Sequence, residues 1–277
     1  MLFRLAFALA SIALVSMTAL LVDPIDAVAQ DMLRSVDLNS PDMSTSEMTR
    51  GEVEALLDAA PPDATGQRSA DLQGKRLSHL DLSGLDFSGS NLRLVKLNGA
   101  NLKGARFDRA ILNQAWLIDA DLTGASLARA SLLGTQMQRA RLGGADLQGA
   151  RITADLSGAS LVEARLAGAD LSADMRNQSM GMMRGVLKSA DLSNADLSGA
   201  NLARADLEFA KLANANLANC NLSRADLAGA DLSNASLAGA DFTETDLASS
   251  LLPDAAALAG ARNLDKARNL DLARRQP

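Results

Sequence analysis

Residues 190–199 read Ala-Asp-Leu-Ser-Asn-Ala-Asp-Leu-Ser-Gly, and this five-residue pattern recurs along most of the chain. From Ala70 to Leu252 an apolar residue, nearly always Leu, occupies every fifth position with two breaks. A period of five fits neither an α-helix, a half-buried strand nor a coiled coil. A five-residue unit is too short to bury its Leu alone. Successive units must therefore turn corners and stack on earlier turns of the chain, which predicts a solenoid.

We call the apolar residue of each unit its centre, and the chain has 35 of them in three runs. The first run is Leu72, Leu77, Leu82, Phe87, Leu92, Leu97, Leu102, Phe107, Leu112, Leu117, Leu122, Leu127, Leu132, Met137, Leu142, Leu147 and Ile152. The second is Leu156, Leu161, Leu166 and Leu171. The third is Leu187, Leu192, Leu197, Leu202, Leu207, Leu212, Leu217, Leu222, Leu227, Leu232, Leu237, Phe242, Leu247 and Leu252.

The other positions of the unit agree with this interpretation. The residue two before the centre is Ala in most units, such as Ala100 and Ala105, which indicates a crowded interior position. Asp or Asn directly before the centre favours a turn, because its short side chain bonds nearby backbone groups. Gly, Ser, Thr and Asn after the centre are typical of a corner.

These units resemble those of the pentapeptide-repeat family, over roughly two thirds of the chain. The resemblance implies an all-β solenoid, a right-handed parallel β-helix with a square cross-section. Four units make one coil on that template, with the centre and the residue two before it pointing inward. The 35 units would then make about nine coils, and we expect short helical segments at both ends.

The best-known members of this family mimic DNA and bind DNA gyrase, which requires a strongly acidic surface. Residues 70–252 hold 18 Lys and Arg against 20 Asp and Glu, so their charges nearly balance. Stacking also places residues 20 apart over one another, such as Asp121 over Arg141. One like-charged column is expected, at Asp206, Asp226 and Asp246. A DNA-mimic regulator of gyrase is therefore the alternative only if the chain is not exported.

The N-terminus predicts export. Arg4 precedes an uncharged, largely apolar stretch over residues 5–22, and Ala27-Val28-Ala29 follows as a small-x-small cleavage pattern. We predict a signal peptide over residues 1–29 and a periplasmic or secreted protein. The apolar stretch is also long enough to span a bilayer. The alternative is a membrane anchor over residues 5–22, with the repeat outside the cytoplasm.

The segments on either side of the repeat differ from it. Residues 30–69 carry a net charge of −5 and read as an acidic linker. A short helix is expected there from Thr49 to Ala60, with Thr49 and Glu52 forming a capping box. Residues 253–277 are Ala- and Leu-rich with a basic tail and read as a C-terminal cap. Both segments would cover the open ends of the solenoid.

The sequence predicts neither an enzyme nor a cofactor. His79 is the single histidine, and a lone His is more often a surface residue than a general base. Cys220 is the single cysteine and takes the inward position of its unit, where it acts as a small hydrophobe. There is no cluster of metal-binding His and Cys and no Gly-rich phosphate loop. With one Trp, six Phe and no Tyr, the chain is not expected to bind nucleic acid.

Two breaks interrupt the spacing. One residue is missing between Ile152 and Leu156, which either shifts every later face or is absorbed in a tight corner. The second break covers residues 172–186 and contains Met175, Met180, Met182 and Met183. Met175 and Met180 could still be centres, with a loop or bulge around residues 178–185. The methionines then fill gaps, contact a partner or bind Cu(I).

Two aromatic residues point outward by register. Trp116 precedes a centre and stacks against Lys96, and Phe209 follows a centre by two residues. We expect partner contacts at both, and at Met180, Met182, Met183 and Arg184 in the second break. The partner is an unknown protein, and membrane contact requires that the N-terminal segment is retained. Both a monomer and an end-to-end dimer are compatible with this pattern. We therefore predict an exported, non-enzymatic scaffold or interaction module.

Overall fold

A computed structural model describes residues 36–62, 66–173 and 183–276. The chain divides into two units, Met1–Asp37 and Leu38–Pro277, and the description below concerns the second. The signal peptide expected over residues 1–29, and its alternative as an anchor over residues 5–22, lie outside the described residues. Within the described ranges, no helix has the length and apolar character needed to cross a membrane.

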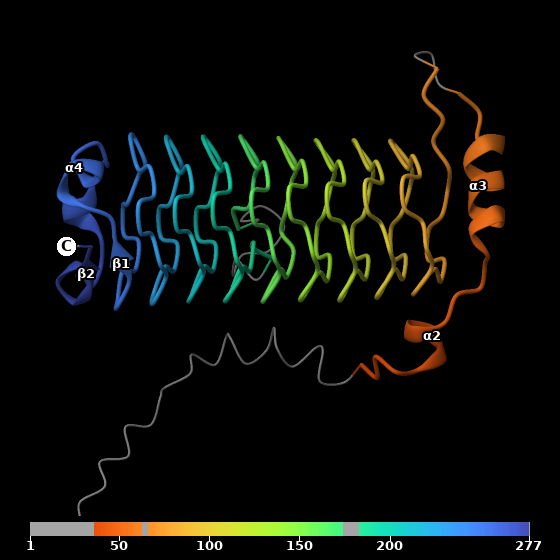
Figure 1. The fold of residues 1–277 in the computed structure, drawn as a ribbon, viewed down its shortest axis with the longest axis horizontal. Helices are drawn as coiled ribbons and strands as arrows, with labels where there is room; N and C mark the ends of the chain where they lie inside the picture. The colour runs from red at the N-terminus through yellow and green to blue at the C-terminus, as the bar shows by residue number, and fades with distance from the viewer. Residues whose placement is uncertain (1–35, 63–65, 174–182, 277) are drawn as a thin grey trace, which may run out of the picture. The chain divides into compact units, whose positions relative to one another are not determined.

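The repeat folds into coils that stack by parallel pairing of residues 20 positions apart (Figure 1). Trp116, for example, bridges Lys96 on one side and Gln136 on the other. Its N–H donates to the carbonyl of Val95 (2.8 Å), and its carbonyl accepts from the N–H of Leu97 (2.7 Å). Each coil thus satisfies the backbone groups of its neighbours. This is the stacked arrangement that the five-residue spacing predicts.

The core runs along the inside of the stack. All 35 centres are buried, and none is more than 1% exposed. The Ala residues two positions earlier are buried beside them, for example Ala100 and Ala105. Phe87 and Phe107 stack one coil apart, with ring centroids 5.0 Å from each other. Each buried Leu contributes roughly 1.5–3 kcal/mol before the entropy cost of ordering the chain. The prediction of inward centres is confirmed.

Each corner is a tight turn made by the two residues that follow a centre. Ala100 donates its N–H to the carbonyl of Leu97 (3.1 Å) and so closes a four-residue turn. The second corner residue has a positive φ, as at Phe209 (57°), which is what a type II turn requires. The Asp or Asn before a centre accepts from the backbone two residues on, as Asp121 does from Thr123 (3.1 Å).

Within the described residues, two helices precede the first coil: α2 over Pro41–Ser44 and α3 over Arg50–Ala59. α3 begins after Thr49, whose side chain accepts from the N–H of Glu52 while the Glu52 carboxylate accepts from the N–H of Thr49. This is the capping box expected from the sequence. Val53 of α3 is fully buried in the core, so the helix covers the open end of the first coil. The sequence did not predict α2, because four residues carry no periodic pattern.

The last centre, Leu252, lies in β1 (Leu251–Leu252). The described residues after it form four short elements: α4 (Ala255–Leu258), the 3₁₀ helices η1 (Leu264–Lys266) and η2 (Leu270–Leu272), and β2 (Arg274–Arg275). β2 pairs in parallel with β1, which places Arg274 against Leu251. Arg262 and Arg268 bridge Asp241 and Asp246 in the same direction. Arg274 and Arg275, expected as the basic tail of the C-terminal cap, therefore pair with the last coil.

The missing residue after Ile152 is absorbed at one corner. Only Thr153 separates Ile152 from the inward Ala154, where two residues stand at other corners. The bridges of this coil join residues 19 apart, such as Gln136 with Asp155, and the later faces keep their alignment. Thr153 is 3% exposed, and its hydroxyl has no hydrogen-bond partner. Of the two outcomes expected from the sequence, the structure has the tight corner.

The second break leaves the ladder intact. Bridges across it join residues 31 apart, as Asp170 with Asn201. Gly185 donates its N–H to the carbonyl of Leu171 (2.9 Å), the bond that closes an ordinary corner. The next centre after Leu171 is therefore Leu187. The expected loop over residues 178–185 was wrong at its end, because Gly185 takes an inward position. A Cβ on Gly185 would lie 2.9 Å from the Leu171 carbonyl oxygen.

Candidate functional site

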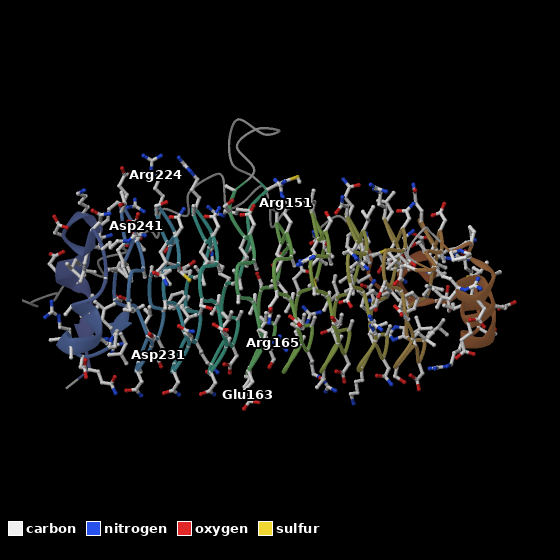
Figure 2. The ribbon with its side chains drawn as sticks, turned by 90° about the horizontal axis from the view of Figure 1, so that it is seen from above. Arg151, Glu163, Arg165, Arg224, Asp231 and Asp241 are labelled. Atoms are coloured by element: carbon white, nitrogen blue, oxygen red, sulfur yellow. The ribbon has the colours of Figure 1, made fainter. Side chains whose placement is uncertain are left out.

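Outward side chains form columns along the stack, because bridged residues lie over one another (Figure 2). Asp121 and Arg141 are bridged and ion-paired, as the spacing predicts. Burial disfavours the charged form of Asp121, but hydrogen bonds from Thr123 and Arg141 outweigh it and hold the pKa of Asp121 well below its usual range. Asp119 and Arg139 form a bidentate pair (2.8 and 2.7 Å). Much of the surface charge is therefore cancelled within columns.

One column carries three stacked carboxylates, at Asp206, Asp226 and Asp246. An arginine lies at each end of it, since Arg184 pairs with Asp206 (3.2 Å) and Arg268 pairs with Asp246 (3.6 Å). Asp226 lies between them. Burial raises the pKa of Asp226, and the charges of Asp206 and Asp246 raise it further. The expected like-charged column exists, but two arginines offset much of its charge.

Phe209 is an exposed aromatic residue whose ring packs on the next coil. Its side chain is 58% exposed at a corner, where φ is 57°. The ring lies over Gly229, one coil further on, and a Cβ on Gly229 would stand only 2.4 Å from the Phe209 Cδ1. Gly229 therefore provides the space in which the ring rests. Phe209 is outward, as the register predicts.

Trp116 lies in the column that begins with Arg76 and Lys96 and is half-buried. Lys96 is bridged to Trp116, as the 20-residue spacing predicts. The Lys96 ammonium lies 3.1 Å from a carboxylate oxygen of Asp42, a residue of α2. The expectation of a partner contact at Trp116 stays a prediction.

The described residues include only part of the methionine cluster. Met175, Met180 and Met182 lie outside them, whereas Met183 and Arg184 are described and half-buried. Arg184 ties this segment to the carboxylate column through Asp206. Partner contact and Cu(I) binding by the cluster both stay predictions.

Cys220 and His79 occupy positions that serve the fold. Cys220 is fully buried, its thiol donates to the Leu197 carbonyl (2.8 Å), and burial raises its pKa to about 12. Such a thiol is not a nucleophile at neutral pH. His79 is a corner residue with a φ of 62°, and its ring lies over Gly99. In the part of the chain that the structure describes, no group of three His, Cys, Asp or Glu could hold a metal ion.

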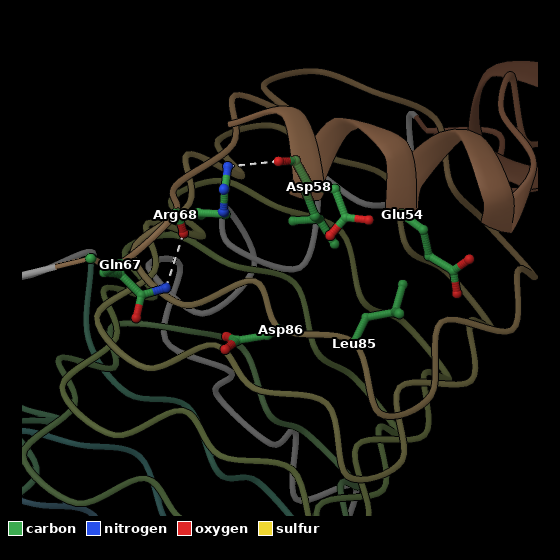
Figure 3. A pocket seen from close by; sticks show the side chains of 8 residues that line it. Glu54, Asp58, Gln67, Arg68, Leu85 and Asp86 are labelled. Atoms are coloured by element: carbon green, nitrogen blue, oxygen red, sulfur yellow. Dashed lines mark hydrogen bonds between the residues drawn. The ribbon is translucent and has the colours of Figure 1, made fainter. Parts of the chain in front are cut away.

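A cavity of about 410 Å³, which sequence reasoning missed, lies between α3 and the first coils (Figure 3). Its lining is mainly polar and acidic: Glu54, Asp58, Gln67, Arg68, Leu85 and Asp86. Arg68 donates to the carbonyls of Asp58 and Ala60 (both 2.7 Å), and Gln67 donates to the carbonyl of Ser88 (3.2 Å). These bonds join the end of α3 to the coils, so the side chains around the cavity serve mainly to attach the helix.

A second cavity, of about 470 Å³, lies at a corner that carries Arg109 and Arg129. Sequence reasoning did not select these residues either. The available signal was their separation of 20 positions at the same place in the unit, which stacks two like charges.

A family model described as pentapeptide repeats matches the chain in 8 copies, between residues 68 and 173 and between residues 186 and 248. Among solved structures, HetL, a pentapeptide repeat protein involved in heterocyst differentiation regulation from the cyanobacterium Nostoc sp. strain PCC 7120, is 31% identical. That match covers 82% of this chain and 95% of HetL, with a TM-score of 0.43.

QnrB1, a plasmid-mediated fluoroquinolone resistance protein, is 22% identical over 74% of this chain and 85% of its own, with a TM-score of 0.47. A pentapeptide repeat protein from the Arabidopsis thaliana thylakoid lumen is 23% identical over 68% and 76%, with a TM-score of 0.21. A search of curated proteins found no match.

The family model spans more than half of the chain, and its matches coincide with the region of stacked coils. The buried centres and the 20-residue pairing are what such repeats require. The chain belongs to the pentapeptide repeat family.

Proposed function

We propose that this protein is an exported, non-enzymatic scaffold that binds a protein partner in the periplasm or outside the cell. The apolar stretch over residues 5–22 and the Ala27-Val28-Ala29 pattern support export. The stacked coils support a scaffold, since they offer long contact faces. The proposal includes the finer features that the family implies: a right-handed β-helix of about nine coils with short helices at its ends.

The observation that carries the proposal is the exposed ring of Phe209. A single exposed apolar residue is common on proteins. Phe209 differs because its ring packs over Gly229 of the next coil. Its neighbour Glu208 is already paired with Lys188 (2.6 Å). A partner can therefore bury this large apolar side chain without separating Glu208 from its cation.

The roles of two relatives suit an interaction module. HetL is involved in the regulation of heterocyst differentiation, and QnrB1 is a fluoroquinolone resistance protein. From these relatives we take only the general class of function, that of a module that interacts with other proteins.

A weaker proposal is a regulator of DNA gyrase that mimics DNA. The stacked carboxylates of Asp206, Asp226 and Asp246 favour it. The arginines at both ends of this column and the nearly balanced charge of residues 70–252 weigh against it. It also requires that the protein stay in the cytoplasm, so cell fractionation separates the two proposals.

The test is a pull-down from the exported fraction with the chain that begins at Gln30, compared with a Phe209→Ser variant. Asn219→Ser is the matched control, because Asn219 is also a corner residue whose side chain lies over a glycine, Gly239. We expect quantitative mass spectrometry to show one protein retained by the wild type and the control, and reduced at least about tenfold with Phe209→Ser. Equal recovery with Phe209→Ser would remove Phe209 as the contact, and substrate turnover by the purified chain would overturn the scaffold proposal.

A further inference from the structure

The geometry points to an anion site at a different corner of the stack: we infer that Arg109 and Arg129 bind an oxyanion, namely a phosphate or sulfate group. The two arginines are the second corner residues of successive coils, with φ values of 58° and 57°. Both are exposed, and both line the cavity of about 470 Å³. The site is independent of Phe209 and of the proposed protein partner.

The shape of the corner leaves room for a ligand beside the two guanidinium groups. Small residues line the cavity beyond the arginines, namely Ala128, Gly149 and Ala167. The Cγ of Arg129 lies 3.6 Å from the place where a Cβ of Gly149 would stand, so the arginine stem rests on this glycine. Neighbouring coils are separated by about 4.8 Å, the spacing of paired strands. The two corners are therefore one coil spacing apart, a separation that two arginine side chains can span to bind the same tetrahedral anion.

The charges of these two arginines are not compensated by the protein. Neither guanidinium has an ion pair or hydrogen bond with any residue that the structure describes. Arginines at two other corners are held by an acidic residue one coil away: Arg139 by Asp119 and Arg224 by Glu244. At the corner of Arg109 and Arg129, by contrast, the residue one coil away is another arginine. Like charges that face each other across paired strands are destabilising, and a bound anion removes that repulsion.

The two carboxylates that line the cavity are engaged by other groups. Asp108 accepts from the Ser126 hydroxyl and from Arg106 (3.2 Å). Asp146 pairs with Arg165 (3.5 Å). Asp108 shares Arg106 with Asp86 (3.6 Å), and Asp146 has Arg165, so the carboxylates at this cavity take their ion pairs from cations other than Arg109 and Arg129. Guanidinium groups bind phosphate and sulfate through two parallel hydrogen bonds each, which fits the chemistry of this corner.

The test is isothermal titration calorimetry at low salt. The chain that begins at Gln30 is titrated with inorganic phosphate and, in a separate experiment, with sulfate. The Arg109→Gln/Arg129→Gln double variant should bind phosphate at least about tenfold more weakly than the wild type. Arg139→Gln is the matched control, because this corner arginine is already paired with Asp119, and it should change the affinity by less than about twofold. Equal melting temperatures of the three proteins show that the coils are intact.

A second arm identifies the source of the anion. Sedimentation with vesicles of phosphatidic acid, compared with phosphatidylcholine alone, tests a lipid headgroup against a soluble phosphate. Vesicle binding that the double variant abolishes supports a headgroup, and binding of soluble phosphate alone supports a soluble source. The inference is overturned if the wild type shows no saturable binding in either arm, or if Arg139→Gln weakens binding as much as the double variant. Phe209→Ser should leave phosphate binding unchanged, which separates this test from that of the proposed function.

Discussion

Cys220 and Phe209 illustrate, at the scale of the residue, how position within the five-residue unit sets a side chain's surroundings. Cys220 stands two before a centre and is fully buried, so its thiol is inert despite being the only cysteine. Phe209 stands two after a centre and is more than half exposed despite being apolar. Chemical type alone places Cys220 correctly, since a free Cys is commonly buried, but it would have buried Phe209 as well.

Thr153 should be replaceable by Val with a gain in stability. Its buried hydroxyl has no hydrogen-bond partner, and an unsatisfied buried hydroxyl costs about 1–3 kcal/mol. We expect Thr153→Val to raise the free energy of unfolding in urea by about 1 kcal/mol. Thr135→Val is the control with the opposite sign, because the buried Thr135 hydroxyl donates to the Leu112 carbonyl (2.8 Å). A loss of stability in Thr153→Val would show that the hydroxyl is satisfied.

Asp226→Asn should stabilise the protein at neutral pH. The folded state raises the pKa of Asp226, so its charged form is less favourable there than in the unfolded chain. At pH values above that raised pKa, the substitution should increase the free energy of unfolding by roughly 0.2–1 kcal/mol, which is the range for charge pairs across neighbouring strands. The gain should shrink as the pH falls through the folded pKa and vanish below the unfolded pKa, where the carboxyl is neutral in both states.

The matched comparison is Asp121→Asn, whose original carboxyl has a lowered pKa. It should destabilise the protein at pH 7, and that loss should diminish in acid as Asp121 itself becomes protonated. Urea unfolding of both variants at pH 7 and at pH 3 gives the four free energies of unfolding to compare with those of the wild type. A destabilised Asp226→Asn at pH 7 would contradict the repulsion within the column.

The corner, at the scale of the element, is the place where the repeat accepts changes in length. One corner loses a residue at Thr153, and another accepts the insertion between Ala173 and Gly185, without loss of pairing in the coils on either side. Backbone pairing is carried by the short segments around the centres, so a corner can change while the ladder persists.

Removal of residues 174–184 should restore a regular unit. The remaining residues would read Leu171-Ser172-Ala173-Gly185-Val186-Leu187, with the centres five positions apart. The bond from the Gly185 N–H to the Leu171 carbonyl already closes this corner. The deletion also removes Arg184, which pairs with the nearly buried Asp206, so we expect the free energy of unfolding, followed by circular dichroism, to fall by about 1–3 kcal/mol.

A larger deletion that also removes Gly185 supplies the control. It takes away an inward residue together with its hydrogen bond and should be clearly less stable than the first deletion. Gly185→Ala should also destabilise, by about 1–3 kcal/mol, because the new Cβ would meet the Leu171 carbonyl and Cβ. If both deletions have the same stability, Gly185 does not hold the corner.

The elements that could be predicted are those in which side-chain identity repeats. The centres and their pairing follow from the Leu spacing, and α3 follows from Thr49 and Glu52 at its start. Gly185 was placed outside the stack because a residue without a side chain leaves no trace in an apolar pattern. The corner of Arg109 and Arg129 was missed for another reason: a cavity depends on what neighbouring coils leave unfilled, which the spacing alone does not describe.

At the scale of the whole molecule, the stacked coils have an apolar interior and polar outward columns with different roles. The interior specifies the fold and leaves the corners and columns free to vary. Several outward charges are paired along columns, which favours recognition at a few particular corners over recognition by a uniformly acidic surface. Phe209 lies at one such corner, and Arg109 and Arg129 lie at another. Export of the chain would place both binding sites outside the cytoplasm.

The most direct test of an exported scaffold is cell fractionation followed by the intact mass of the native protein. The account predicts a protein in the periplasmic or secreted fraction whose mass corresponds to a chain beginning at Gln30. A full-length chain found in the cytoplasm would contradict it.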